Sequence, residues 1–216
     1  VLIMTKSFSL VRVVHVTSAH PIRDTRIFEK ECKTLSSNGF ETFIVGPGEH
    51  QDNILGIKFI TFKGEVGRFK RMIFATTKAV WLARKLKANV YHIHDPELLP
   101  VARLILGLFS SGVLIYDMHE NLPKDLVTKE WIFPHLRPII SKTFKLLERV
   151  LLFNLPVIFA ETSYKDDYPW LRKTIDILNF PRIHNLKQIG EKTEKSPNKI
   201  GYIGNISATR HAHTVL

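Results

Sequence analysis

The chain has only one cysteine, Cys32. No disulfide can form within it, which excludes a cysteine-stapled secreted fold and makes a reducing compartment the expected environment. Cys32 falls on a helical spacing with Phe28 and Leu35, so we expect a packed core thiol and not a reactive one.

Long apolar runs are also missing. No stretch of about 18 apolar residues occurs, so we expect no transmembrane helix. The segment from Val1 to Leu10 lacks the small-residue cleavage site of a secretory signal, and we expect a cytoplasmic protein. With 216 residues, 44% of them hydrophobic, the chain can form one full domain, or one domain and the start of another.

Several signatures of catalysis and binding are absent from the sequence. Neither GxGxxG nor GxxxxGK[ST] follows the first predicted strand, and GxSxG does not occur, which disfavours dinucleotide-binding, P-loop and serine-hydrolase enzymes. His and acidic residues pair at 94–95 and 119–120, but without HxxxH or Cys-rich spacing we expect no metal site. No nucleic-acid-binding module is recognisable, so we expect no nucleic acid partner.

Acidic residues are outnumbered by basic ones, and the net charge is +11. Such an excess predicts an anionic partner. Between Gly67 and Ala88 there are seven Lys or Arg residues and no acid, with apolar residues interspersed. This basic amphipathic pattern, from Arg68 to Lys87, has two interpretations. Either it contacts an anionic membrane surface, or it is a surface helix that covers one face of a sheet and exposes its basic face to solvent.

Short apolar strands and amphipathic helices alternate along the chain. The predicted strands span 11–16, 41–45, 57–62, 90–93, 112–116, 157–160 and 176–178. The predicted helices span 24–38, 67–88, 97–109, 125–131, 137–153 and 163–173. This alternation predicts an α/β fold with a Rossmann-like, doubly wound parallel sheet over residues 1–186. A polar linker at 187–198 would follow, and 199–216 would form the first strand and loop of a truncated second domain.

Polar side chains gather where the predicted strands end, at the sheet edge where ligands bind. His20, Asp24 and Arg26 follow the first strand, and Glu161 follows the sixth. The fourth and fifth strands end in His94-Asp95-Pro96-Glu97 and Asp117-Met118-His119-Glu120. Since the first and fourth strands are neighbours in the doubly wound order, one crevice would hold His20, Arg26, Asp95, Glu97, His119 and Glu120. These donors and acceptors suit a polyhydroxylated ligand.

Structural roles stay open for the acidic residues and for Arg26. Asp95 and Glu97 would also serve as caps of the helix that follows them. Asp24 would serve as an N-cap alone, with Arg26 as its ion partner or as a solvated charge.

The histidines divide in the same way. His15 and His92 lie within predicted strands, where a satisfied core position is the expected role. His119 is the hardest to explain by structure alone, because it stands among acidic residues just beyond a strand.

Six segments of the chain resemble a known family. In order they are HVTSAHPIRDTRIFEKECKTLSSNGFETFIV, VYHIHDPELLP, IYDMHEN, FAETSY, ILNFP and IGYIGNIS. Together they resemble the N-terminal half of a family 4 glycosyltransferase of the GT-B fold, of the bacterial polysaccharide or lipopolysaccharide type. The resemblance covers nearly the whole chain, from about residue 11 to 210.

The resemblance implies retaining transfer of a sugar from a nucleotide-sugar donor to a glycan or lipid-linked acceptor, usually without a metal or other cofactor. It implies that His119 contacts the transferred sugar near the reacting centre. The loop from His20 to Arg26 takes the place of a glycine-rich flexible loop, and Asp95 with Glu97 matches an acidic acceptor site. Basic helices in this domain often place such enzymes on the inner face of the cell membrane.

The resemblance also assigns the donor diphosphate to Gly204, Asn205 and Arg210, although Asn205 stands where the family usually has Arg. His211 replaces a Gly, and the donor-gripping glutamates of the second domain have no counterpart. The chain therefore resembles half an enzyme: a fragment, a truncated reading frame or one subunit of a split enzyme. Two hypotheses follow. It is a glycosyltransferase half that needs its donor-binding half, or a non-catalytic acceptor- or membrane-binding subunit with a separate donor-binding chain.

Overall fold

The structure is a computed structural model that describes residues 10–64, 67, 70–129 and 132–181. The predicted linker, the strand predicted after it, and Gly204, Asn205 and Arg210 lie outside these residues, as does Arg68. None of the helices in the described part of the chain combines the length and the apolar character that a membrane span needs.

Seven parallel strands form one sheet in the order β3-β2-β1-β4-β5-β6-β7. They are β1 (Arg12–Val16), β2 (Glu41–Pro47), β3 (Lys58–Phe62), β4 (Val90–Ile93), β5 (Val113–Met118), β6 (Val157–Phe159) and β7 (Thr174–Asp176). The chain winds outward from β1 in one direction and from β4 in the other, so the switch point lies between β1 and β4. The predicted Rossmann-like, doubly wound α/β fold is confirmed, including the contact between the first and fourth strands.

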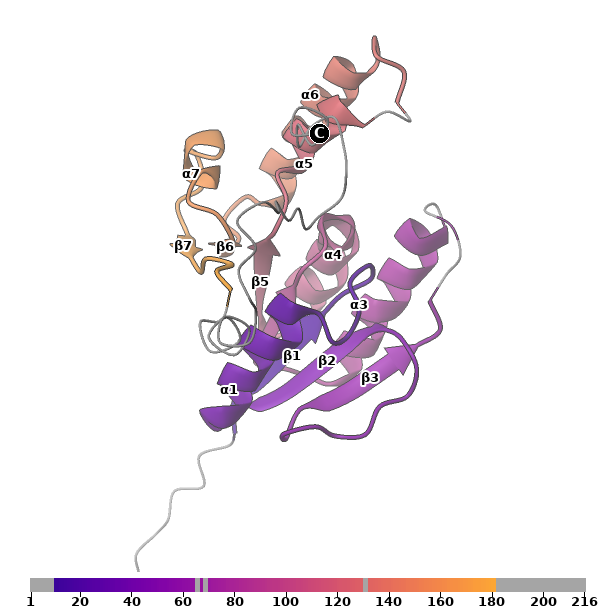
Figure 1. Cartoon of the computed structure of the whole chain (residues 1–216), viewed down its shortest axis with the longest axis vertical. Helices are drawn as coiled ribbons and strands as arrows, with labels where there is room; N and C mark the ends of the chain where they lie inside the picture. Colours follow the sequence, from indigo (N-terminus) through magenta and orange to yellow (C-terminus); the bar gives the residue numbers. More distant parts are fainter. Residues whose placement is uncertain (1–9, 65–66, 68–69, 130–131, 182–216) are drawn as a thin grey trace, which may run out of the picture.

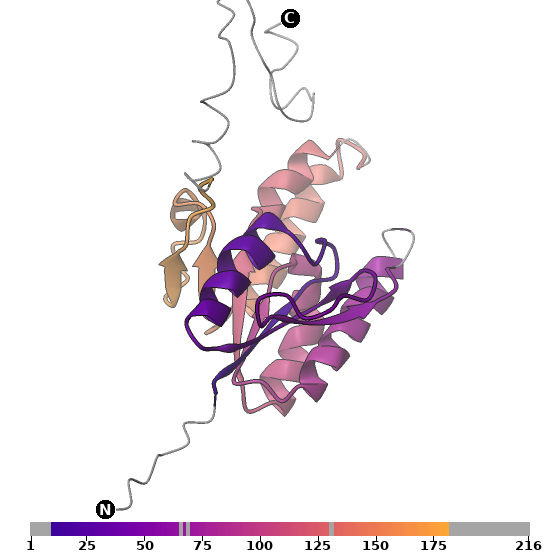
Figure 2. The same ribbon diagram turned by 60° about the horizontal axis from the view of Figure 1, so that its bottom comes forward.

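Helices cover both faces of the sheet (Figure 1). One face carries η1 (Thr25–Cys32) and α1 (Lys33–Ser37). The other carries α3 (Thr76–Lys85), preceded by η2 (Arg71–Ala75), and α4 (Leu99–Phe109), preceded by η3 (Pro96–Leu98). Figure 2 shows the same separation of α1 from α3 and α4 in a second view. Beyond β5 the chain forms α5 (Leu122–Thr128), α6 (Arg137–Leu151) and α7 (Tyr164–Asp167).

The two faces of the sheet have different interiors. Under α3 and α4 the core is apolar, and Val14 and Val16 of β1 belong to the same buried cluster as Ala79 and Leu106. Under η1 a smaller apolar cluster contains Ile27, Phe28 and Cys32 with Ile44 and Phe59. Cys32 is fully buried, and burial raises the pKa of its thiol, which agrees with a core role.

The helix predicted over 24–38 is present but begins in an unexpected form. Asp24 is its N-cap, and its Oδ1 accepts hydrogen bonds from the backbone N–H groups of Arg26 and Ile27. Residues Thr25–Cys32 form a π-helix before α1 continues as an α-helix. Gly39, with φ of 84°, follows the C-cap Asn38 and supplies the left-handed conformation at which helices commonly end.

Several predicted elements have the wrong bounds. The helix predicted over 125–131 spans Leu122–Thr128, and the strand predicted over 176–178 spans Thr174–Asp176. The helix predicted over 163–173 ends at Asp167, since Pro169 disfavours helical geometry at Tyr168. The fifth strand extends to Met118, because Asp117 pairs with Ile158 of β6 instead of starting a loop.

One acidic side chain is buried on α6. Glu148 is 1% exposed, and the Tyr168 hydroxyl donates a hydrogen bond of 3.0 Å to its Oε2. Burial raises the pKa of Glu148 to about 7, so the apolar surroundings hold its carboxyl near the midpoint of titration at neutral pH.

Candidate functional site

The loop after β1 and the turn after β4 meet at the switch point through Asp95. The carboxylate is 2% exposed, and its Oδ2 accepts from the Thr17 hydroxyl at 2.8 Å and the Ser18 backbone N–H at 2.6 Å. Its Oδ1 lies 2.6 Å from Nδ1 of His20. Burial opposes ionisation of Asp95, but the hydrogen bonds from His20, Ser18 and Thr17 outweigh it and hold its pKa well below the ordinary value.

This geometry decides between the two roles open for Asp95. It occupies the N-cap position of η3, but its side chain makes no cap hydrogen bond. Its carboxylate oxygens instead make hydrogen bonds to the loop after β1, so the capping interpretation of Asp95 is wrong. The hydrogen bond to Asp95 raises the pKa of His20.

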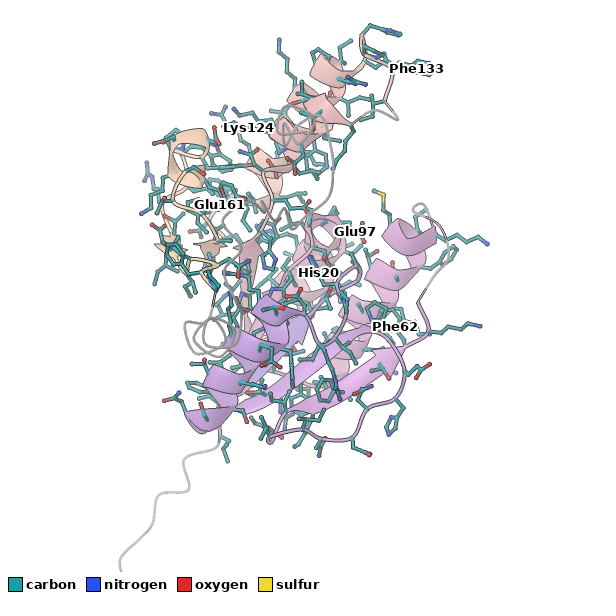
Figure 3. The ribbon with its side chains drawn as sticks, in the orientation of Figure 1. His20, Phe62, Glu97, Lys124, Phe133 and Glu161 are labelled. Atoms are coloured by element: carbon teal, nitrogen blue, oxygen red, sulfur yellow. The ribbon has the colours of Figure 1, made fainter. Side chains whose placement is uncertain are left out.

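Glu97 joins the same cluster from the start of the helical segment after β4. The Ser18 hydroxyl donates 2.8 Å to its Oε1, while Glu97 itself stays partly exposed. Figure 3 shows His20 and Glu97 at the carboxyl edge of the sheet. The structure therefore brings His20, Asp95 and Glu97 together, as the crevice hypothesis required.

His119 stands at the end of β5, facing this cluster. Its Nε2 lies 2.5 Å from Oδ2 of Asp117, and its ring centroid lies 5.4 Å from that of His20. The Tyr164 hydroxyl donates 2.8 Å to the backbone carbonyl of His119 and fixes the turn. With Nε2 directed at the Asp117 carboxylate, Nδ1 of His119 makes no hydrogen bond to the described residues.

Arg26 does not pair with Asp24 and is not solvated. It is 3% exposed and reaches from η1 to β5, where Nε and Nη2 donate to the two carboxylate oxygens of Asp117 at 2.8 and 2.7 Å. Its Nη1 donates to the backbone carbonyl of Ile177 at 2.7 Å. Burial opposes ionisation of Asp117, but hydrogen bonds from His119, His94 and Arg26 hold its pKa well below the ordinary value.

Glu120 and Glu161 lie beside His119. Both are exposed, and with His119 they line a surface depression of about 370 Å³. Lys124 and Asp167 also line it and form an ion pair of 2.7 Å. Figure 3 shows Lys124 on α5 and Glu161 beyond the end of β6. His119 is thus the residue shared by the switch-point cluster and the depression.

A buried polar layer under η1 escaped the sequence prediction. It contains His15, His92 and His94, whose side chains are between 0% and 8% exposed, and Glu31, which is 10% exposed. Nε2 of His15, Nε2 of His92 and both oxygens of Glu31 have no hydrogen-bond partner among the described residues. The expectation that His15 and His92 are satisfied core residues is therefore wrong, although both are buried.

Electrostatics in this layer follow from burial. Desolvation lowers the pKa of His15, His92 and His94, so the imidazoles are held neutral. Desolvation and the nearby charge of Asp117 raise the pKa of Glu31 well above its ordinary value. A sequence signal for this layer existed: residues two apart in extended chain share a face, and His94, just beyond the end of β4, is two residues from His92.

Chemically, the site offers carboxylates, an imidazole and a nearby ammonium group at one rim, which suits a ligand with several hydroxyl groups. Comparison with known proteins adds no assignment, since no family model and no curated protein matches this chain.

Proposed function

We propose that this chain is the acceptor-side half of a retaining glycosyltransferase that moves a sugar from a nucleotide-sugar donor to a polysaccharide or lipid-linked acceptor. The supporting observation is the position of His119. It stands at the switch-point edge of a doubly wound sheet, oriented by Asp117 and set between two groups of carboxylates. Such an edge is where this fold class binds ligands.

In this proposal the carboxylates select the acceptor. Glu97, Glu120 and Glu161 have the exposure to accept hydrogen bonds from sugar hydroxyls, whereas Asp95 is buried and positions His20. Asp24 acts as the helix cap and Arg26 as the anchor of Asp117, so both support the site and do not touch substrate.

His119 would contact the transferred sugar through Nδ1, with the Asp117 contact fixing its ring. Catalysis would rest on positioning and on electrostatic stabilisation of an oxocarbenium-like transition state and a leaving diphosphate. Stabilisation of the leaving diphosphate would fall to a donor-binding half. Gly204, Asn205 and Arg210 would be the first residues of that half.

The basic segment supports a peripheral membrane site for the acceptor. Helix α3 covers the sheet with Ala79, Val80 and Ala83 fully buried, so the sheet-covering interpretation is correct for its inner face. The exposed surface of η2, just before α3, is not only polar: Met72, Ile73 and Phe74 are 44% to 61% exposed. Since this segment follows β3, it lies toward the carboxyl edge of the sheet, and we propose that it contacts anionic lipid there.

The test is sugar transfer with the donor-binding half present. The gene region after Leu216, or a chain that copurifies from native cells, would supply that half. Nucleotide release would be measured with a panel of nucleotide sugars and bacterial glycan acceptors. We expect no measurable transfer by the 216-residue chain alone. We expect His119→Ala to lower kcat of the joined protein about 10²–10³-fold.

The matched control is His50→Ala, since His50 is exposed and lies outside the site. Full turnover in the His119→Ala protein would remove this residue from the mechanism. Transfer by the isolated chain would remove the need for a second half. A non-catalytic acceptor-binding subunit is the alternative, and it predicts glycan binding without turnover in every combination.

A further inference from the structure

We propose that His15, Glu31, His92 and His94 form a closed structural site for a divalent transition metal, with Zn²⁺ the best fit. This proposal does not depend on the glycosyltransferase assignment. His15 comes from β1, Glu31 from η1 and His92 from β4, while His94 directly follows β4, and the four residues meet between the sheet and its first helix.

The spacing of the donor atoms fits a tetrahedral ion. Oε2 of Glu31 lies 3.6 Å from Nδ1 of His15, 3.8 Å from Nδ1 of His92 and 3.8 Å from Nε2 of His94. Nδ1 of His15 lies 3.0 Å from Nε2 of His94. Zn²⁺ bonds of 2.0–2.1 Å place tetrahedral ligand atoms about 3.3–3.4 Å apart, within a few tenths of an ångström of these four separations. The two remaining pairs of ligand atoms also lie within 4.8 Å of one another.

The chemistry of the four groups points to a cation. Both Glu31 oxygens are buried without a hydrogen bond, even though Nε of Arg26 approaches Oε1 to 3.2 Å. Arg26 directs its hydrogen bonds to Asp117 and Ile177 instead, which leaves the carboxylate of Glu31 facing three imidazoles. Imidazole and carboxylate ligands in a tetrahedral set are typical of Zn²⁺.

Asp117 supplies the outer support that metal-bound histidines usually have. With Nε2 of His94 turned toward Glu31, its Nδ1 lies 3.2 Å from Oδ2 of Asp117. This is a carboxylate–histidine–metal arrangement, in which the carboxylate fixes the tautomer of the ligand. Arg26 donates hydrogen bonds to both carboxylate oxygens of Asp117 and so fixes the group that orients His94.

Four protein ligands leave no open position, which makes the site structural and not catalytic. A metal there would join η1 to the β1–β4 pair. A second group, His94, Asp117 and His119, also has ligand atoms within 4.8 Å of one another. It is the weaker candidate, because both oxygens of Asp117 already accept hydrogen bonds from Arg26.

The experiment measures binding of Zn²⁺ and Co²⁺ to the purified chain after chelator treatment. We expect one tightly bound ion per chain, competed by a chromophoric chelator, and the strong visible absorption of four-coordinate Co²⁺. Glu31→Gln and His92→Gln should each weaken Zn²⁺ binding more than about 100-fold, since even outer-sphere changes weaken metal sites 10–100-fold. Zn²⁺ should raise Tm of the wild-type chain.

His50→Gln and His119→Ala are the controls, and both should keep the ion. Circular dichroism of each variant separates loss of the site from loss of the fold. Absence of tight binding to the wild-type chain, or unchanged affinity in the folded Glu31→Gln variant, overturns the proposal. Loss of the ion in His119→Ala with retention in Glu31→Gln would place the metal in the second group and also overturns it.

Discussion

Arg26 and Asp117 meet through two parallel hydrogen bonds, of 2.8 and 2.7 Å, although they lie 91 residues apart in the sequence. Asp117 is 0% exposed and Arg26 is 3% exposed, so the pair is a buried bidentate salt bridge between η1 and β5. The bridge also orients His119 and His94, which both contact Oδ2 of Asp117.

Replacing Arg26 should show how much the Arg26–Asp117 ion pair contributes to the free energy of unfolding. We expect Arg26→Met to lower the free energy of unfolding by about 3–5 kcal/mol, because it leaves the Asp117 charge buried without its main partner. Urea unfolding at neutral pH measures the change. Arg23→Met is the control, since Arg23 is exposed and should change stability by less than about 0.5 kcal/mol. A loss below about 1 kcal/mol in Arg26→Met would show that solvent or relaxation compensates Asp117.

The His20–Asp95 pair predicts a bell-shaped contribution to stability. The lowered pKa of Asp95 gives stability that is lost as pH falls through that value. The raised pKa of His20 gives stability that is complete below about pH 6.5 and is lost as pH rises through the raised value. We expect Asp95→Asn to destabilise the chain by about 2–3 kcal/mol near pH 6.

The histidine reports this pair directly. An NMR titration should show the pKa of His20 falling in Asp95→Asn, since its largest stabilising contact is gone. Glu97→Gln leaves the His20–Asp95 contact in place and should keep that pKa. An unchanged pKa in Asp95→Asn would mean that the contact is not formed in solution.

Glu148 predicts a loss of stability toward neutral pH. Its pKa is raised to about 7, so the protonated carboxyl is favoured in the folded chain. Stability from this group is complete below its unfolded pKa, about 4.3, and declines as pH rises through 7. The expected decline between pH 4.5 and 8 is about 3 kcal/mol. Urea unfolding of Glu148→Gln should lack this decline, whereas the exposed Glu161→Gln should show it in full.

The exposed apolar side chains of η2, just before α3, predict lipid binding. Ile73→Ser combined with Phe74→Ser should weaken binding to phosphatidylglycerol vesicles about tenfold or more, because each side chain stands for more than 1 kcal/mol of apolar burial. Cosedimentation measures this. Wild-type binding should also fall with added salt and be weak on phosphatidylcholine. Leu55→Ser is the control, since Leu55 is 67% exposed but lies away from this segment. Equal binding by both variants would contradict the proposed contact.

The fold was predictable from the sequence because its signals are local. Alternating apolar strands and amphipathic helices specify a doubly wound sheet, and the switch point then places His20, Asp95 and Glu97 together. Asp24 was predictable as a cap, since a cap involves only neighbours in the chain.

The buried polar contacts were not predictable in the same way. Arg26 reaches Asp117 across the sheet, and the sequence alone gives no reason to prefer that partner to Asp24. The sequence gives no signal for the burial of Glu31, because an acidic residue on a predicted helix is normally solvated. Its burial depends on the π-helical geometry of η1. The pairing of Arg26 with Asp117 depends on a long-range contact, and the burial of Glu31 depends on helix geometry. Composition predicts neither.

The π-helix sets a constraint on chain length that composition does not reveal. Arg26 and Glu31 both enter the polar layer, and Ile27 and Cys32 both enter the apolar cluster, although each pair is five residues apart. In an α-helix residues five apart point about 140° away from each other. Winding this segment as an α-helix at its present length would therefore turn one member of each pair toward water. Deleting one residue between Ile27 and Glu31 would instead place each pair four apart, about 40° from each other on an α-helix, so the length of the segment and its π-helical winding are matched.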